Sequence, residues 1–117
     1  MDIQRWGVRA KGRCTTVARG DLVWSVSNAK NLAGDFDAQV RETLDILDAS
    51  LAEAGSSRER LLSVQVILAD IGTRDRFNEA WCRWVGDDPS HWPQRAVYGA
   101  DLAPGLLIEV IATAARS

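Results

Sequence analysis

The clearest pattern of apolar and polar positions lies between residues 35 and 55. Apolar side chains recur there at spacings of three and four, with polar side chains between them. The apolar members are Phe36, Val40, Leu44, Leu47, Leu51 and Ala54. Asp35 precedes them as a favourable N-cap residue, and Gly55 follows them as a common helix stop. The spacing predicts an amphipathic helix between these two residues.

A second helical pattern begins near Thr73, which is a candidate cap. Its apolar stripe consists of Phe77, Ala80, Trp81 and Trp84. The breaker sequence Gly-Asp-Asp-Pro-Ser at residues 86–90 ends the pattern. We therefore expect a second, shorter helix before residue 86.

Strand patterns occupy most of the remaining chain. The β-prone runs 14–18 and 22–27 flank Gly20 and Asp21, a pair suited to a tight hairpin turn. Residues 61–69 alternate in polarity, which predicts a strand with one wholly apolar face against the first helix. The members of that face are Leu62, Val64, Val66 and Leu68. Residues 93–98 and 106–115 predict the last two strands, and residues 1–12 an edge strand or ordered arm.

The predicted order is strand, strand, helix, strand, helix, strand, strand, which is an α+β arrangement. At 117 residues we expect a single domain spanning residues 1–117. Two helices cover only one face of such a sheet, so another element must cover the second face. In so short a chain, we expect that cover to be another copy of the same protein.

Composition limits the function classes. A formal net charge of −2 and a pI near 5.3, with no block of basic residues, argue against a nucleic-acid binder. No apolar stretch has transmembrane length and the N-terminus has no signal region, so we expect a cytoplasmic protein without a membrane partner. Cys14 and Cys82 lack metal-site spacing, and buried, reduced thiols are the favoured interpretation.

The candidate chemistry lies in the last two predicted strands. Glu109 is the single charge in the apolar run 106–112, and an ionised carboxylate there needs a partner. Arg95 lies in the preceding strand and is a natural partner, so the two side chains are predicted to face each other on adjacent strands. A structural ion pair explains Arg95 equally well on this evidence, and a solvent-facing edge position explains Glu109.

Several motifs together resemble the Rid family, also called the YjgF or reactive-intermediate deaminase family. They include Val-Gln-Val-Ile-Leu-Ala-Asp at 64–70, Phe-Asn-Glu-Ala-Trp at 77–81, Pro-Gln-Arg-Ala-Val at 93–97 and Ile-Glu-Val-Ile-Ala at 108–112. The resemblance covers nearly all of the chain after residue 13. It departs at Val26-Ser27, where the family has Ser-Gly, and at Val97, where it has cysteine or a small polar residue.

This resemblance implies a chorismate-mutase-like mixed sheet with two helices on one face. It also implies a homotrimer with a barrel-like core and active sites between subunits. The implied activity is hydrolytic deamination of enamine and imine intermediates to 2-oxo acids and ammonia, without metal or cofactor. Arg95 corresponds to the arginine that grips the substrate carboxylate, Glu109 to the glutamate that handles the attacking water, and Asn78 to the asparagine of the second helix.

Other residues have weaker claims on the site. Ser25 and Ser27 could hydrogen-bond a substrate, although strand or turn polarity explains them as well. Trp24 could line the cleft or pack in the trimer core, and Val97 is a further candidate for the lining. His91, the only histidine, is expected to be a surface-loop residue.

Two other function classes compete with the deaminase. The same pocket could bind a small carboxylate such as a 2-oxo acid without catalysis, and Val26 and Val97 favour this slightly. Ribonuclease activity is disfavoured by the acidic pI and the absence of a basic stripe.

Overall fold

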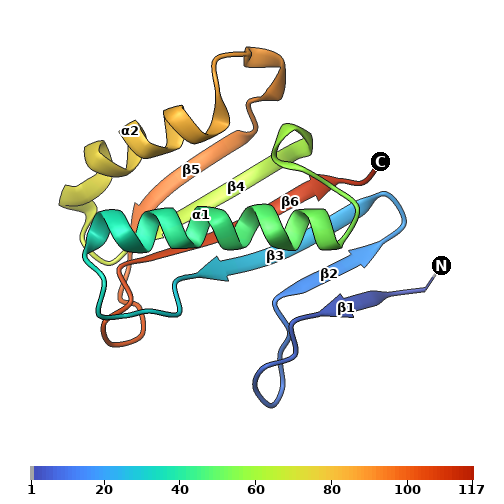
Figure 1. The fold of residues 1–117 in the computed structure, drawn as a ribbon, viewed down its shortest axis with the longest axis horizontal. Coiled ribbons are helices and arrows are strands. Elements are labelled where there is room, and N and C mark those ends of the chain that lie inside the picture. Colours follow the sequence, from blue (N-terminus) through green and yellow to red (C-terminus); the bar gives the residue numbers. More distant parts are fainter. Residues whose placement is uncertain (1) are drawn as a thin grey trace.

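A computed structural model describes residues 2–117 as one six-stranded sheet with two α-helices across one face (Figure 1). The strands are β1 Gln4–Trp6, β2 Thr16–Arg19, β3 Leu22–Asn28, β4 Leu61–Leu68, β5 Gln94–Gly99 and β6 Ile108–Ala115. The helices are α1 Phe36–Glu53 and α2 Arg74–Val85, with short 3-10 turns at Arg58–Arg60, Ile71–Thr73 and Pro89–His91. The predicted α+β class and the helices on a single face are confirmed.

The last strand in the sequence lies in the middle of the sheet. The strand order is β1-β2-β3-β6-β4-β5, so β6 pairs with β3 on one side and with β4 on the other. These pairings and those of the N-terminal strands are antiparallel, whereas β4 and β5 are parallel. β5 therefore forms one edge of the sheet and β1 forms the other (Figure 1).

Local sequence signals account for the predicted turns and for the first helix. Arg19 pairs with Leu22, so Gly20 and Asp21 form a two-residue hairpin loop, and Gly20 adopts a positive φ of 59°. The Asp35 carboxylate accepts a hydrogen bond of 2.9 Å from the backbone N–H of Ala38, which caps α1 as predicted. Thr73 occupies the N-cap position of α2, but its hydroxyl donates to the Asp70 carbonyl instead of capping the helix.

The predicted apolar face of β4 is wrong at one position. The pairing of β4 with β6 shifts register between Leu61 and Ser63, which is a bulge. Leu61 is consequently buried in the core, whereas Leu62 is 48% exposed. Beyond the bulge, Val64 and Val66 meet the helices as predicted.

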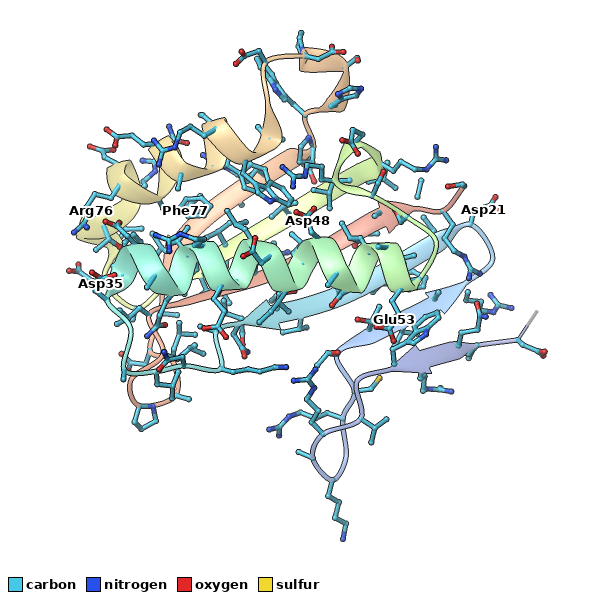
Figure 2. All side chains as sticks on the ribbon, viewed as in Figure 1. Asp21, Asp35, Asp48, Glu53, Arg76 and Phe77 are labelled. Atoms are coloured by element: carbon cyan, nitrogen blue, oxygen red, sulfur yellow. The ribbon has the colours of Figure 1, made fainter. Side chains whose placement is uncertain are left out.

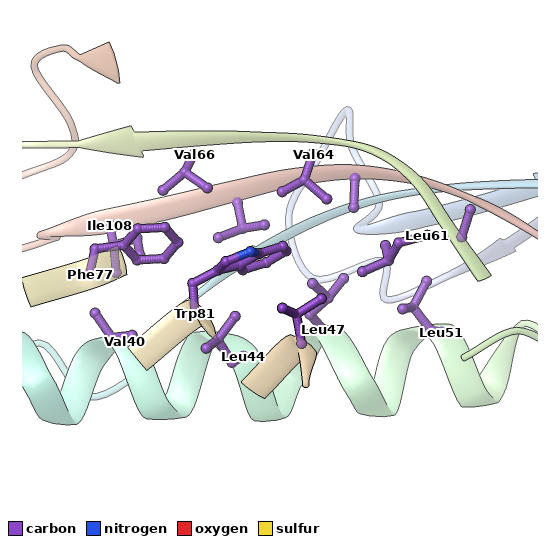
Figure 3. Packing of buried hydrophobic residues seen from close by; sticks show 14 of the residues in the cluster. Val40, Leu44, Leu47, Leu51, Leu61, Val64, Val66, Phe77, Trp81 and Ile108 are labelled. Atoms are coloured by element: carbon purple, nitrogen blue, oxygen red, sulfur yellow. The ribbon is translucent and has the colours of Figure 1, made fainter. Parts of the chain in front are cut away.

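The hydrophobic core fills the layer between the helices and the sheet. Side chains of both helices pack there against alternate residues of the central strands, as Figure 3 shows. The core members labelled in that view are Val40, Leu44, Leu47, Leu51, Leu61, Val64, Val66, Phe77, Trp81 and Ile108. A polar cluster also links the helices. Arg58, in the turn after α1, pairs with Asp48 of α1 and lies over the ring of Trp84 of α2. The labelled Asp48 lies between the helices in Figure 2.

The opposite face of the sheet carries exposed apolar side chains. Along β3, Leu22, Trp24 and Val26 are 37%, 40% and 38% exposed, and they alternate with buried residues. On β6, Ile111 shares this face and is half-buried. We call this surface the open face, and no helix of residues 2–117 covers it. Among the same residues, no helix is long and apolar enough to cross a membrane.

Candidate functional site

Glu109 lies on the open face of the central strand β6. The core-facing residues Ile108 and Val110 flank it in sequence, so its own side chain points away from the helices. Its cross-strand neighbours are Asn28 on β3 and Ile67 on β4. The Asn28 side-chain amide donates a hydrogen bond of 3.0 Å to Oε1 of Glu109. This amide satisfies one carboxylate oxygen and fixes the orientation of the group.

Arg95 lies on the edge strand β5 and faces the helices. It pairs with Val64, whose side chain is in the core, and its guanidinium carbon lies 5.6 Å from the Phe77 ring and 5.5 Å from the Trp81 ring. Both rings belong to α2, and these distances are typical of cation–π contacts. Nη1 of Arg95 is buried without a hydrogen-bond partner in residues 2–117. A half-buried, incompletely bonded guanidinium is a suitable receptor for a carboxylate.

Partial burial is the main cause that lowers the pKa of Arg95, and two residues of α2 modify this effect. The Cys82 thiol raises the pKa of Arg95, whereas the Arg74 charge lowers it. Arg74 lies one turn before Phe77 on α2 and Cys82 follows Trp81, so both belong to the part of the helix whose aromatic rings lie over the guanidinium.

The prediction that Arg95 and Glu109 face each other on adjacent strands is wrong. β4 lies between their strands, and the two side chains point to opposite faces of the sheet. Within one chain, the partner of Glu109 is Asn28 instead. A single small substrate therefore cannot touch Arg95 and Glu109 of the same protomer.

Asn78 lies on the exposed surface of α2, in the helix that packs over Arg95. It is four residues from both Arg74 and Cys82, so the three side chains form one stripe along the helix. The stripe adjoins Phe77 and Trp81, whose rings lie over Arg95, so Asn78 is on the flank of α2 next to the guanidinium. The expectation of a buried thiol is wrong for Cys82, which is exposed, while Cys14 is half-buried.

The other candidate residues do not line one cleft. Trp24 is on the open face, where it pairs with Val17 and Thr113. Ser25 and Ser27 point the other way, into the layer beneath the helices, and both are buried with hydroxyl groups that have no hydrogen-bond partner among residues 2–117. Val97 lies beyond Arg95 on the same side of β5 and packs against the core. Within one chain, Trp24 therefore lies on the same face of the sheet as Glu109, and Val97 lies on the same face as Arg95.

Asn28 is the functional candidate that sequence reasoning missed. It is 81 residues from Glu109 in the chain, and the two meet only because β6 inserts beside β3. Its position at the end of the β3 pattern was visible in the sequence, but its partner depends on strand order.

A separate groove of about 480 Å³ lies between α1 and α2. Its charged lining consists of Asp37, Arg41, Asp45, Arg76, Glu79 and Arg83. These charges balance in number, and the groove contains neither Arg95 nor Glu109. His91 lies in the short turn before β5, where its Nε2 is 3.7 Å from Asp88. In residues 2–117 no three His, Cys, Asp or Glu side chains gather as a metal-binding group.

Residues 8–116 match the family model described as endoribonuclease L-PSP. The chain belongs to the YjgF, or Rid, family. The RutC family protein YoaB of Escherichia coli is 33% identical over 100 residues, which cover 85% of this chain and 86% of the relative. A RutC family protein of Haemophilus influenzae is 36% identical over 74 residues, and this match spans 62% of each chain.

Solved structures of this family have the same fold. A YjgF family member from Neisseria meningitidis superposes with a TM-score of 0.89 at 30% identity, covering 100% of this chain and 97% of that one. A protein from Pseudomonas aeruginosa also gives a TM-score of 0.89 at 30% identity, covering 99% of this chain and 100% of that one. The resemblance inferred from the motifs is thereby confirmed at the level of family and fold.

Proposed function

We propose that the protein hydrolyses the C=N bond of small 2-imino acids, in sites that two protomers of a homotrimer build together. The single observation that carries this proposal is the pair of half-buried ionic groups on opposite faces of the sheet. Arg95 offers a partnerless Nη1 beside two aromatic rings, and Glu109 is held by Asn28 among apolar side chains. Family membership supports the same reaction.

The open face supports the assembly. Exposed Leu22, Trp24 and Val26 lie together there, with half-buried Ile111, and a contiguous apolar patch of this kind marks an interface. Covering the patch with a second copy buries Glu109 at the contact between protomers. Within one protomer, Arg95 and Glu109 point to opposite faces of the sheet. Since Arg95 lies on the edge strand β5, the second copy can bring its own Arg95 to the Glu109 of the first. A closed trimer, as the family resemblance implies, repeats this contact three times.

The chemistry follows from these groups. The guanidinium of Arg95 binds the substrate carboxylate through two parallel hydrogen bonds and so fixes the position of the imine carbon. The Glu109 carboxylate takes a proton from water as the water oxygen attacks that carbon, and then returns the proton to the departing amine. The protonated imine and one water yield a 2-oxo acid and ammonium, so atoms and charge balance without an oxidant. Asn28 holds Glu109 in place during the transfer.

The direct test supplies an imine generated in situ from an amino acid by an amino-acid oxidase. We expect faster release of the 2-oxo acid with the wild-type protein, and at least a hundredfold loss in kcat/KM for Arg95→Ala and for Glu109→Ala. Hydrolysis by both variants at the wild-type rate would show that the assigned roles are wrong. Binding of 2-oxo acids without imine turnover would favour the alternative, a carboxylate-binding module.

A complementation test addresses the two-protomer site. The Arg95→Ala and Glu109→Ala chains are each expected to be inactive, but mixed trimers contain sites with both native residues. For random assembly about a quarter of the sites are restored, and activity should recover to that fraction. Absence of recovery in mixed trimers verified by mass spectrometry would mean that both residues act from one protomer or not at all.

A further inference from the structure

Three side chains of α2 form a stripe beside Arg95, and none of them has a role in the reaction proposed above. Arg74, Asn78 and Cys82 follow one another at intervals of four residues, so they lie on one side of the helix. The rings of Phe77 and Trp81 lie over the Arg95 guanidinium, and this stripe adjoins those two residues on the helix surface, so it lies beside the sheet edge that carries Arg95. The other arginines of the helix, Arg76 and Arg83, instead line the groove toward α1.

Neither the Arg74 nor the Arg95 guanidinium has an acidic partner within residues 2–117. The ion pairs among residues 2–117 are Asp48 with Arg58, Asp37 with Arg76, and Asp88 with His91, and none includes Arg74 or Arg95. Two like charges near one another are unfavourable in the free protein. An anion that reaches both guanidinium groups removes this repulsion, and an anion with two negative groups does so most effectively.

We propose that the preferred substrates are 2-imino dicarboxylates, in which the carboxylate next to the imine binds Arg95 and the distal carboxylate binds Arg74. This inference rests on the function proposed above and adds its specificity. Asn78 lies one turn after Arg74 on α2 and next to Phe77, whose ring lies over Arg95, so its amide can donate to the distal carboxylate. Arg74 is a specificity-determining residue here, because a monocarboxylate leaves it unused.

The test measures binding of the product class by titration calorimetry. The probes are 2-oxoglutarate, a dicarboxylate, and 2-oxobutyrate, a monocarboxylate. We expect the wild-type protein to bind 2-oxoglutarate about tenfold more tightly, because one additional charge-assisted contact forms. Arg74→Gln should abolish this preference and leave the affinity for 2-oxobutyrate within about threefold of wild type.

Arg83→Gln is the matched control. It removes the same charge from the same helix, on the side that lines the groove between α1 and α2. The preference for the dicarboxylate should therefore persist in this variant. A loss of preference equal to that of Arg74→Gln would assign the effect to overall charge and overturn the inference. The Arg74 side chain is exposed and forms no ion pair within residues 2–117, so its replacement should leave the fold intact.

The outcomes separate this inference from the function on which it rests. Equal affinity of the wild-type protein for both probes, together with imine hydrolysis, would overturn the dicarboxylate preference alone. No hydrolysis of any 2-imino acid by the wild-type protein would overturn the proposed function. In a second measurement, we expect kcat/KM to be higher for imines derived from aspartate and glutamate than for those derived from alanine.

Discussion

The two faces of the sheet are built from the same strands, yet the helices cover only one of them. On the covered face, Val23, Val64 and Val110 are fully buried under the helices. On the open face, Leu22, Trp24 and Val26 alternate with buried residues of β3 but remain exposed. One face thus buries its hydrophobic side chains within the chain, and the other leaves them exposed.

This difference separates stability from function. The covered face contains buried polar groups without an evident chemical role, such as the hydroxyls of Ser25 and Ser27. The open face is more exposed, and it contains the hydrogen-bonded pair of Asn28 and Glu109. We therefore expect substitutions on the covered face to change the free energy of unfolding, and those on the open face to change assembly and activity.

The largest effect on the free energy of unfolding is expected from Leu47→Ala on the covered side. Leu47 is fully buried beneath the sheet, so truncation removes apolar contacts and leaves a cavity. The expected loss is about 2–5 kcal/mol, measured by urea unfolding. Leu62→Ala is the control, because Leu62 projects outward at the β4 bulge and should change stability by about 0.5 kcal/mol or less. A similar cost for both variants would contradict the assignment of the bulge.

The next effect concerns assembly and uses Trp24→Lys. A lysine ammonium at the centre of the open face loses hydration when a second copy covers it. The dissociation constant of the oligomer should rise at least tenfold, or about 1.4 kcal/mol, as measured by light scattering over a concentration series. Leu32→Lys, at an exposed apolar loop position, should leave assembly unchanged. If Trp24→Lys also leaves assembly unchanged, the open face is not the interface.

A smaller effect is expected from Asn28→Ala. Loss of the amide removes the donor to Oε1 of Glu109 and frees the carboxylate to rotate. Because a hydrogen bond to a charged group contributes about 1.5–3 kcal/mol when buried, and this pair is only part-buried, kcat should fall about tenfold. KM for the imine should change little, since Arg95 holds the substrate. A change confined to KM would assign Asn28 to substrate binding.

The smallest effect is expected from Ser27→Ala, the neighbour of Asn28 on the opposite face. The Ser27 hydroxyl is buried and has no hydrogen-bond partner in the described part of the chain, so its removal costs no hydrogen bond there. The free energy of unfolding should stay within about 0.5 kcal/mol of wild type or rise slightly. Imine hydrolysis should be unaffected, and a large loss of activity would return Ser27 to the site.

The elements were predictable from the sequence because their signals are local. Asp35 and Gly55 mark the limits of α1, and Gly20 with Asp21 forms the hairpin turn. The face of Leu62 was not predictable, because a one-residue bulge reverses the alternation of a strand without leaving a local signal.

The separation of Arg95 from Glu109 was also not predictable from the sequence. It depends on the position of β4 between their strands, which arises from packing of the whole chain. The same long-range pairing creates the contact between Asn28 and Glu109. Both residues of the proposed chemistry could therefore be named from sequence and family resemblance, while their spatial relation could not.

The central position of β6 has a consequence for synthesis in the cell. Residues 108–115 leave the ribosome after the strands on both sides of them, and β3 and β4 each lack one neighbour until β6 arrives. During translation the nascent chain thus exposes two unpaired strand edges as well as an apolar face. The complete sheet can therefore form only after residues 108–115 have been synthesised. A chain that stops before Ile108 retains both helices but should be a substrate for chaperones and proteases rather than a stable fragment.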